Sequence, residues 1–388
     1  MSASTNTTSL AYDAETQFGV TNATPQFTLL PTTGGSPVNN ISTAVSEVIR
    51  SDRQTDDLVV VDGDVSGEIN YELSYGPYAD FMDSVLMNNT TSSIDESAVS
   101  NDIATDDFLD KASLESAIAV GDVFHLSSAT NSLIDGAYTC IALGTDSVQI
   151  YPATGTLSNL TDVQVTATSI QTNGSDAIQG YTIRKQADNN GTPYYWYYTG
   201  CAINSMNFNF ATGSILNGSL GIIGLQESTS TSKLAGEQTD IPTPPYSIMN
   251  SVTSVGVIRI EGVTLGVCQF SSLDLTIDNQ INAAKSIGVL GACDLAAYSL
   301  MVTGNTEVYF NNLDLYNKFV NSQSFSVTII VTDTDGNSIG IDIPKCKFES
   351  LDTPISGKDA FLMQSGSFKG LRDSTSDYMV KFSRINAV

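Results

Sequence analysis

The side chains that most often carry out chemistry in proteins are sparse in this sequence. His125 is the one histidine among 388 residues, and the five cysteines lie far apart, with no Cys-x-x-Cys pair. Nucleophilic catalysis needs a base that a third group orients, and a transition-metal site needs several His or Cys ligands. The sequence supplies neither pattern, and it has no glycine-rich phosphate loop of familiar spacing. We therefore expect no catalytic, metal or cofactor site.

Two acidic patterns resemble functional sites, a calcium loop and a pair of catalytic carboxylates. The segment 333–342, DTDGNSIGID, resembles the start of a calcium loop, but its glycine stands at the fourth position and Pro344 occupies the twelfth, where such loops carry Glu. A hairpin turn at Asp335-Gly336 is the better interpretation. Glu68 and Glu72 are spaced like a pair that could serve glycoside hydrolysis. In a chain with 42 acids such pairs arise by chance, so a glycosidase is only a minor alternative.

Acidic residues dominate the charge, with 42 Asp and Glu against 16 Lys and Arg and a net charge of −26. A protein this acidic repels phosphate backbones, which disfavours tight binding to nucleic acids and to anionic membranes. No signal peptide is visible, and the most apolar stretch, 286–304, carries Asp294 and three glycines. We expect a cytoplasmic origin, no membrane segment, and cysteines that serve as small buried apolar residues.

Alternating apolar and polar residues predict strands along much of the chain. Residues 65–73, VSGEINYEL, and 272–278, SLDLTID, alternate with period two, and acids occupy the polar side of both. Two short helices are predicted, at about 77–88 and at 312–321. The apolar side of the first would carry Phe81, Met82, Val85 and Leu86, and that of the second Leu313, Tyr316, Phe319 and Val320.

Three segments depart from the strand pattern. Residues 1–40 are rich in Thr, Asn, Ser and Pro, which predicts an extended or loosely ordered N-terminal arm, and 226–250 should be a long loop. Residues 93–178 open with a polar, acidic stretch and then offer four strand candidates, which predicts a small inserted β domain. These candidates are 123–126, 138–143, 148–151 and 163–170. The β core would then consist of 1–92 and 179–388.

An aromatic run, Tyr194 to Tyr198, precedes Gly200. Alternate members of the run must face opposite sides of a strand, so strand packing or a subunit contact is the favoured interpretation. A surface that stacks on carbohydrate is the alternative. In that case the chain would be a capsid decoration protein or an adhesin module.

Several of these segments resemble, in order and in letters, the major tail tube proteins of long-tailed bacteriophages. The most specific piece is 50–88, which has an Arg-Ser-Asp-Arg-Gln start, a Val-Ser-Gly strand, Glu-Leu-Ser-Tyr-Gly and a helix. Further similar segments are 199–224, 272–281, 302–321 and the closing strands. Together they cover most of the chain outside 93–178.

The resemblance implies a mainly β fold: a tail-tube-type β-sandwich or barrel with one or two short helices, plus an inserted β domain that faces outward. It relates the chain to the tube proteins of contractile tails and type VI secretion. It also implies a structural virion protein, made in the host cytoplasm, and no enzyme. Six copies would form a ring, and stacked rings would form the tail tube. The implied partners are other copies, the tape measure protein, terminator and baseplate proteins, and double-stranded DNA in transit.

The charge and the resemblance together suggest how DNA passes. A hexameric ring would carry 6 × −26 = −156 charges, so an acidic lumen would keep DNA from adhering during ejection. The candidate lumen-facing acids are Glu68, Glu72, Asp274 and Asp278. An outward, solvent-facing position is the alternative for each.

Overall fold

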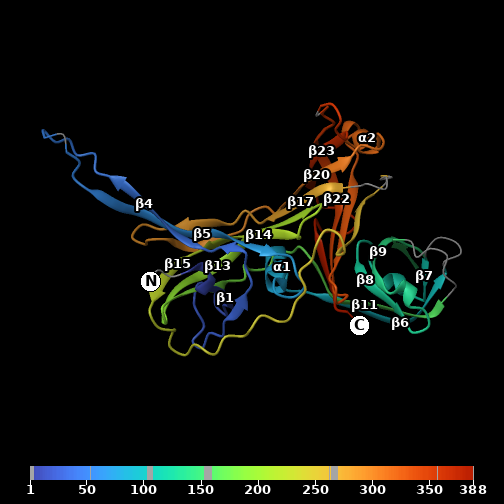
Figure 1. Ribbon diagram of the computed structural model, residues 1–388, viewed down its shortest axis with the longest axis horizontal. Coiled ribbons are helices and arrows are strands. Elements are labelled where there is room, and N and C mark those ends of the chain that lie inside the picture. The colour runs from blue at the N-terminus through green and yellow to red at the C-terminus, as the bar shows by residue number, and fades with distance from the viewer. Residues whose placement is uncertain are drawn as a thin grey trace.

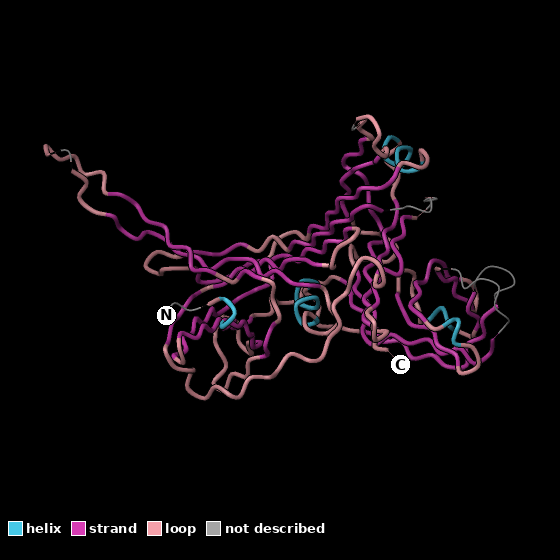
Figure 2. The backbone as a smooth tube through the Cα atoms, viewed as in Figure 1, coloured by secondary structure: helices cyan, strands magenta, loops and turns pink. Residues whose placement is uncertain are grey.

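The structure is a computed structural model that describes residues 4–52, 54–102, 108–152, 160–261, 263, 270–355 and 357–387. Strands make up most of this part of the chain, and two short α-helices interrupt them there (Figure 2). The predicted mainly β fold with one or two short helices is therefore confirmed. Smaller elements are the 3-10 turns Thr5–Thr7, Leu114–Ser116 and Ser132–Ile134 and a hairpin of β18 (Asn282–Lys285) and β19 (Ala292–Ala296).

The larger sheet is antiparallel throughout and includes both strands that the alternating patterns predicted. In spatial order it contains β4 (Val38–Val45), β5 (Leu58–Glu72), β14 (Asn217–Gly224), β13 (Thr192–Ala211), β17 (Phe270–Asp278), β20 (Met301–Tyr309), β23 (Met363–Gly370), β22 (Ser338–Asp352), β21 (Phe325–Thr332) and β16 (Val255–Ile260). The short β3 (Gly34–Gly35) also pairs with β5, and β24 (Lys381–Ile385) with β22.

A smaller sheet shares β13 with the larger one. Its other strands are β2 (Thr28–Leu30), β1 (Thr8–Ala14), β12 (Tyr181–Asn189) and β15 (Gln226–Ser230). The N-terminal half of β13 pairs in the smaller sheet and its C-terminal half pairs in the larger. Gly200 stands where β13 passes from the smaller sheet to the larger one. Its φ is +63, and a Cβ atom there would lie 2.6 Å from the Leu225 side chain. Glycine is the residue that meets both demands.

The main hydrophobic core lies on one face of the larger sheet, which curves around it so that Phe208 of β13 meets Phe382 of β24, and the smaller sheet covers part of this core. Helix α1 (Ala79–Leu86) buries Phe81, Met82, Val85 and Leu86 there, which confirms the helix predicted at 77–88 and its apolar side. Figure 1 shows α1 and β1 on the same side of β5 and β14. The opposite face of the larger sheet is therefore free of this core.

Helix α2 (Asp314–Val320) confirms the helix predicted at 312–321, but most of its predicted apolar side was wrong. Leu315 is the residue it buries, and Phe319 packs partly against the core. Leu313, Tyr316 and Val320 are between 45% and 59% exposed. In a helix of two turns, the tertiary contacts override the weak periodicity.

The N-terminal segment 1–40 differs from the prediction of an extended or loosely ordered arm. Strand β1 runs along β12 over seven residue pairs, and Leu10, Phe27 and Leu30 are buried. The buried carboxylate of Glu15 accepts hydrogen bonds from Thr182 Oγ1 at 2.8 Å, from Gly200 N at 2.9 Å and from Gly19 N at 2.7 Å. These long-range partners order a segment whose composition alone suggests a loop.

Segment 226–250 also differs in part from the predicted long loop, since β15 occupies its start. The rest is held by a buried ion pair, in which Arg184 Nη2 lies 2.7 Å from Asp240 Oδ2 and its Nη1 contacts Glu237 Oε1 at 2.5 Å. The guanidinium also stacks 4.8 Å from the ring centre of Phe27. The loop is thus attached to the smaller sheet.

Residues 92–172 form six strands that close on themselves, in the order β11–β6–β7–β10–β9–β8–β11. They are β6 (Ser92–Asp102), β7 (Phe108–Asp110), β8 (Val123–Ser128), β9 (Gly136–Leu143), β10 (Ser147–Tyr151) and β11 (Leu160–Thr172). The four predicted strands are present, but the polar stretch after residue 93, which carried no strand prediction, contributes β6 and β7. Its strands owe their place to pairing with β11 and β10.

This small barrel has its own hydrophobic cluster but is joined to the larger sheet. The cluster also includes Val257, Ile330 and Ile385, and β11 pairs with β24. Figure 1 shows the barrel at one end of the molecule, beside β22. Whether 93–178 behaves as a separate domain remains a prediction.

Candidate functional site: a polar face of the larger sheet

One face of the larger sheet is polar across six neighbouring strands. The strand register places one row straight across it, formed by Glu72, Asn217, Asn209, Asp274, Asn305 and Ser367. A second row contains Glu68, Gly221, Ser205 and Asp278. All four acids singled out in the sequence therefore lie on one face, on β5 and β17.

The alternation within each strand creates this face. Residues Ile69, Leu275 and Ile277 point to the core, whereas their polar neighbours point away from it. Between the acidic strands, β13 and β14 contribute Asn, Ser and Gly, and Asn207 Nδ2 donates to Thr276 Oγ1 at 2.9 Å across the strands. The surface between the acids is consequently small, neutral and hydrophilic.

The acids on the face are too far apart to act as a catalytic pair. Three strand spacings of about 4.8 Å separate Glu72 from Asp274 by about 14 Å, and four residues of about 3.3 Å separate Glu68 from Glu72 by about 13 Å. Side chains on one face point the same way, so the carboxyl groups keep similar spacings. Glycosidases need their two carboxyl groups roughly 5 to 10 Å apart. The spacing argues against hydrolysis by these pairs.

The four acids have no basic partner among the described residues. Partial burial raises the pKa of Asp274 above its ordinary value. Asp278 Oδ1 accepts a hydrogen bond from Gln280 N at 2.8 Å. The face therefore carries carboxyl groups that no basic side chain of the described residues compensates.

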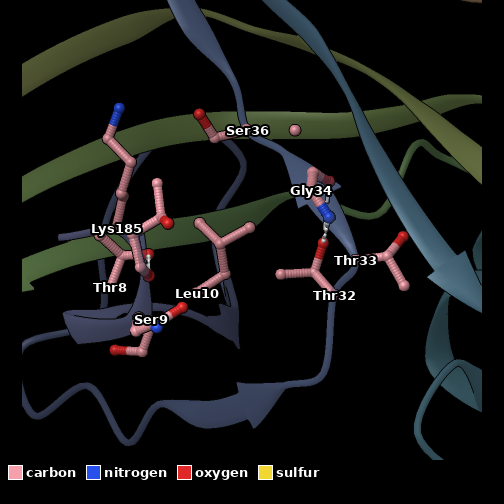
Figure 3. Close-up of a pocket in the computed structure, with 11 residues that line it drawn as sticks. Thr8, Ser9, Leu10, Thr32, Thr33, Gly34, Ser36 and Lys185 are labelled. Atoms are coloured by element: carbon pink, nitrogen blue, oxygen red, sulfur yellow. Dashed lines mark hydrogen bonds between the residues drawn. The ribbon is translucent and has the colours of Figure 1, made fainter.

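A cavity of about 560 Å³ lies elsewhere, between β1, residues 32–36 and Lys185 (Figure 3). Its side chains are mostly hydroxyls, and the Gly34 amide donates to Thr32 Oγ1 at 3.1 Å. The lining includes no carboxylate, imidazole or thiol. A hydroxyl nucleophile needs a base that a third group orients, and the lining offers no such group to orient the lysine.

The remaining sequence candidates occupy structural positions. His125 in β8 is half-buried, and burial lowers its pKa. Asp333 accepts hydrogen bonds from Asp335 N and Asn337 N, both at 2.9 Å. Residues 333–337 thus form the turn between β21 and β22, as predicted, and 338–342 belong to β22. No cluster of three metal-ligating residues occurs among the described residues.

The cysteine prediction holds at three of the four positions described. Cys140, Cys201 and Cys346 are buried free thiols, whereas Cys293 in the β18–β19 hairpin is exposed. Cys268 lies outside the described residues. In the described ranges, no helix is long and apolar enough to cross a membrane.

The aromatic run lies in β13 and mainly packs inward. Tyr195, Tyr197 and Tyr198 are buried, and Tyr194 is exposed. Lys185 Nζ lies 4.8 Å from the ring centre of Trp196 and so occupies one face of the indole. The stacking surface that a carbohydrate would need is thus partly used within the chain.

Comparison with known families decides the identity. The family model for phage tail tube proteins matches residues 5–370, which span both sheets and the small barrel. The chain belongs to the phage tail tube protein family. This confirms the resemblance found in the sequence and makes the protein a structural component of a virion tail. A search of curated proteins gave no match. In a tail tube family, the polar face becomes the candidate surface for contact with the contents of the tube.

Proposed function

We propose that six copies of this chain join into a closed ring, that rings stack into the tail tube, and that the polar face of the larger sheet lines the lumen. Genomic DNA would pass along this face during ejection. The observation that carries the proposal is the gathering of Glu68, Glu72, Asp274 and Asp278 on one face of the sheet, opposite the main hydrophobic core. Such a face suits contact with water and a passing polyanion.

The ends of the larger sheet support ring closure. Its outermost strands, β4 and β16, each pair with one neighbour in the described part of the chain. An open strand edge invites further pairing, and closing sheets into a barrel removes such edges. If β4 of one copy paired with β16 of the next, both open edges of the larger sheet would be paired at once.

The hairpin formed by β4 and β5 supports contact between copies. It projects far from the rest of the molecule (Figure 1). Val59 lies opposite Ala44 and Val60 opposite Thr43, on the two sides of the hairpin, and Leu58, Val59, Val60 and Val61 are each about half exposed. A two-stranded hairpin is marginally stable alone in water, and apolar residues on both its sides call for a cover. Another copy would supply it.

The proposed lumen acts on DNA by repulsion. Uncompensated carboxylates on the inner surface disfavour contact with phosphates, so the duplex slides without adhering. This role involves no turnover, no cofactor and no membrane. The tape measure protein would fill the lumen before DNA does, terminator and baseplate proteins would cap the tube, and the small barrel would face outward.

Electron microscopy of the purified protein tests the proposal. We expect rings or tubes with sixfold symmetry and a central channel in negative stain. Mass photometry should show a species of six chains before long tubes form. A protein that stays monomeric at high concentration, with no rings in any field, would refute ring assembly.

A further inference from the structure

Two lysines stand side by side on the polar face. Lys347 in β22 lies directly opposite Lys369 in β23 in the register. No carboxylate of the described residues forms an ion pair with either one. Like charges directly opposite on neighbouring strands destabilise a sheet. In a chain with 42 acids, such a pair points to an anionic partner.

The lysine pair lies at one margin of the polar face. One row of register partners crosses the sheet and ends at the two lysines. Strand by strand, it contains Asn70, Ser219, Asn207, Thr276, Thr303, Lys369 and Lys347. Lys347 Nζ lies 3.3 Å from Ser322 Oγ, just beyond the end of α2. Tyr316 and Val320 of α2 are exposed. We name these four residues, Lys347, Lys369, Tyr316 and Val320, the lysine margin.

The projecting hairpin has the complementary chemistry. Residues 46–64 contain six acids, Glu47, Asp52, Asp56, Asp57, Asp62 and Asp64, and two arginines, so their net charge is −6 + 2 = −4. The same segment carries the exposed residues Leu58 to Val61. Acidic and apolar groups on the hairpin thus match basic and apolar groups on the lysine margin.

The two surfaces cannot meet within one chain. The hairpin projects on one side of the molecule, and α2 and β22 lie on the other (Figure 1). The partner must therefore be another copy. A contact between two different surfaces of identical chains is head-to-tail, the kind that builds rings and stacks.

We propose that the β4–β5 hairpin of one copy docks on the lysine margin of a neighbouring copy. This inference rests on the proposed tube assembly and names the surface that receives the hairpin. It divides the polar face into two parts: the four acids remain open to the lumen, while the lysines are covered and neutralised. DNA phosphates are the competing partner for lysines, but exposed Tyr316 and Val320 favour a partner with apolar side chains.

Charge reversal tests the contact. Lys347→Glu/Lys369→Glu reverses the margin. Glu47→Lys/Asp57→Lys reverses the two hairpin acids that form no ion pair among the described residues and brings the net charge of residues 46–64 from −4 to −4 + 4 = 0. Each variant alone should raise the concentration needed for tube formation by at least about tenfold, because the attraction between the two surfaces is lost in the hairpin variant and becomes repulsion in the margin variant. An equimolar mixture should form tubes as the wild type does, since every reversed hairpin can meet a reversed margin. Sedimentation and negative stain measure both effects.

A matched control separates this contact from a general charge effect. Lys358→Glu/Arg372→Glu makes the same change in charge at exposed residues that already pair with Asp359 and Asp377, and it should assemble normally. Circular dichroism checks that each variant is folded. Two outcomes would overturn the docking proposal alone. One is normal tube formation by the Lys347→Glu/Lys369→Glu variant, and the other is a mixture of the two folded variants that forms no tubes. Wild-type protein without rings or tubes overturns both proposals.

The competing partner is tested in the same set of proteins. A labelled DNA duplex that binds the wild type, and that the Lys347→Glu/Lys369→Glu variant releases while tubes still form, would assign the lysines to DNA and overturn the docking. If the hairpin covers the lysine margin, wild-type tubes should bind the labelled duplex no better than the Lys347→Glu/Lys369→Glu variant does. Wild-type assembly should also weaken as salt rises, because ions screen the pairing of exposed charges.

Discussion

Lys381 of β24 and Asp122, which precedes β8 of the small barrel, form a buried ion pair with 2.7 Å between Nζ and Oδ1. Lys381 Nζ also lies 3.2 Å from the Val120 carbonyl oxygen. Next to this pair, Asp342 accepts hydrogen bonds from Thr328 Oγ1 at 2.9 Å and from the Tyr378 hydroxyl at 3.0 Å. This buried polar network joins the barrel to the larger sheet.

The first prediction concerns the cost of breaking that ion pair. Lys381→Met should lower the free energy of unfolding by about 3 to 5 kcal/mol, because it leaves Asp122 charged and buried without a cation. Urea unfolding monitored by fluorescence measures the change. The double variant Lys381→Met/Asp122→Leu should recover much of the loss, since it removes both charges. Equal stability of the single variant and the wild type would contradict a buried pair.

The second prediction concerns pH. Burial, opposed by Lys381 and by its hydrogen bonds, raises the pKa of Asp342 from 3.8 to about 6. Because the folded carboxyl binds its proton more tightly than the unfolded one, its stabilising contribution is present below about pH 4 and is lost as the pH rises through about 6. The shift corresponds to about 3 kcal/mol. Asp342→Asn should flatten this part of the curve of unfolding free energy against pH.

The third prediction concerns segment 231–250. Arg184→Met should destabilise the protein by roughly 3 to 5 kcal/mol and expose this segment to proteases, because Glu237, fully buried, loses its buried cation. Limited proteolysis and urea unfolding measure the two effects. Lys233→Met, which removes an exposed cation near the same acids, should cost less than about 1 kcal/mol. Similar effects of both substitutions would argue against the buried pair as the attachment.

The fourth prediction separates assembly from folding. Val59→Ser/Val61→Ser should leave the melting temperature of the monomer almost unchanged, since both side chains are about half exposed in one chain. Tube formation should nevertheless fail, because the apolar cover between copies is lost. Leu133→Ser/Leu143→Ser, at exposed positions of the small barrel, is the matched control and should assemble. Tubes from the valine variant would exclude Val59 and Val61 from the interface.

The fifth prediction concerns the lumen. A variant with amides in place of the four lumen acids should form intact rings but eject DNA more slowly from phage particles, because phosphates would then adhere to the lumen surface. The four acids are Glu68, Glu72, Asp274 and Asp278. Neutralising four acids of the small barrel, Asp95, Asp135, Asp146 and Asp162, should leave the ejection rate unchanged. Ejection is followed by dye uptake onto released DNA. Equal rates in both variants would remove these acids from the lumen.

The sequence by itself determined the local elements whose signals are strong. Period-two alternation located the strands around 65–73 and 272–278, four apolar residues at helical spacing located α1, and Asp335-Gly336 located the turn of the β21–β22 hairpin. The order and identity of residues in several segments also indicated the tail tube protein family. These signals are local because they come from the repeat of a strand, a helical turn or a tight turn, each readable within about ten residues.

Only the tertiary structure decided what pairs with what. Strand β6 is polar in sequence and forms because β11 and β7 pair with it, and β1 is fixed by β12 and by the bonds to Glu15. The common face of Glu72 and Asp274, and the meeting of Lys347 with Lys369, depend on register between strands far apart in the chain. A shift of one residue in any strand would turn its side chains to the other face. Composition carries no information about that register, so the acidic wall and the lysine margin emerge only from the folded sheet.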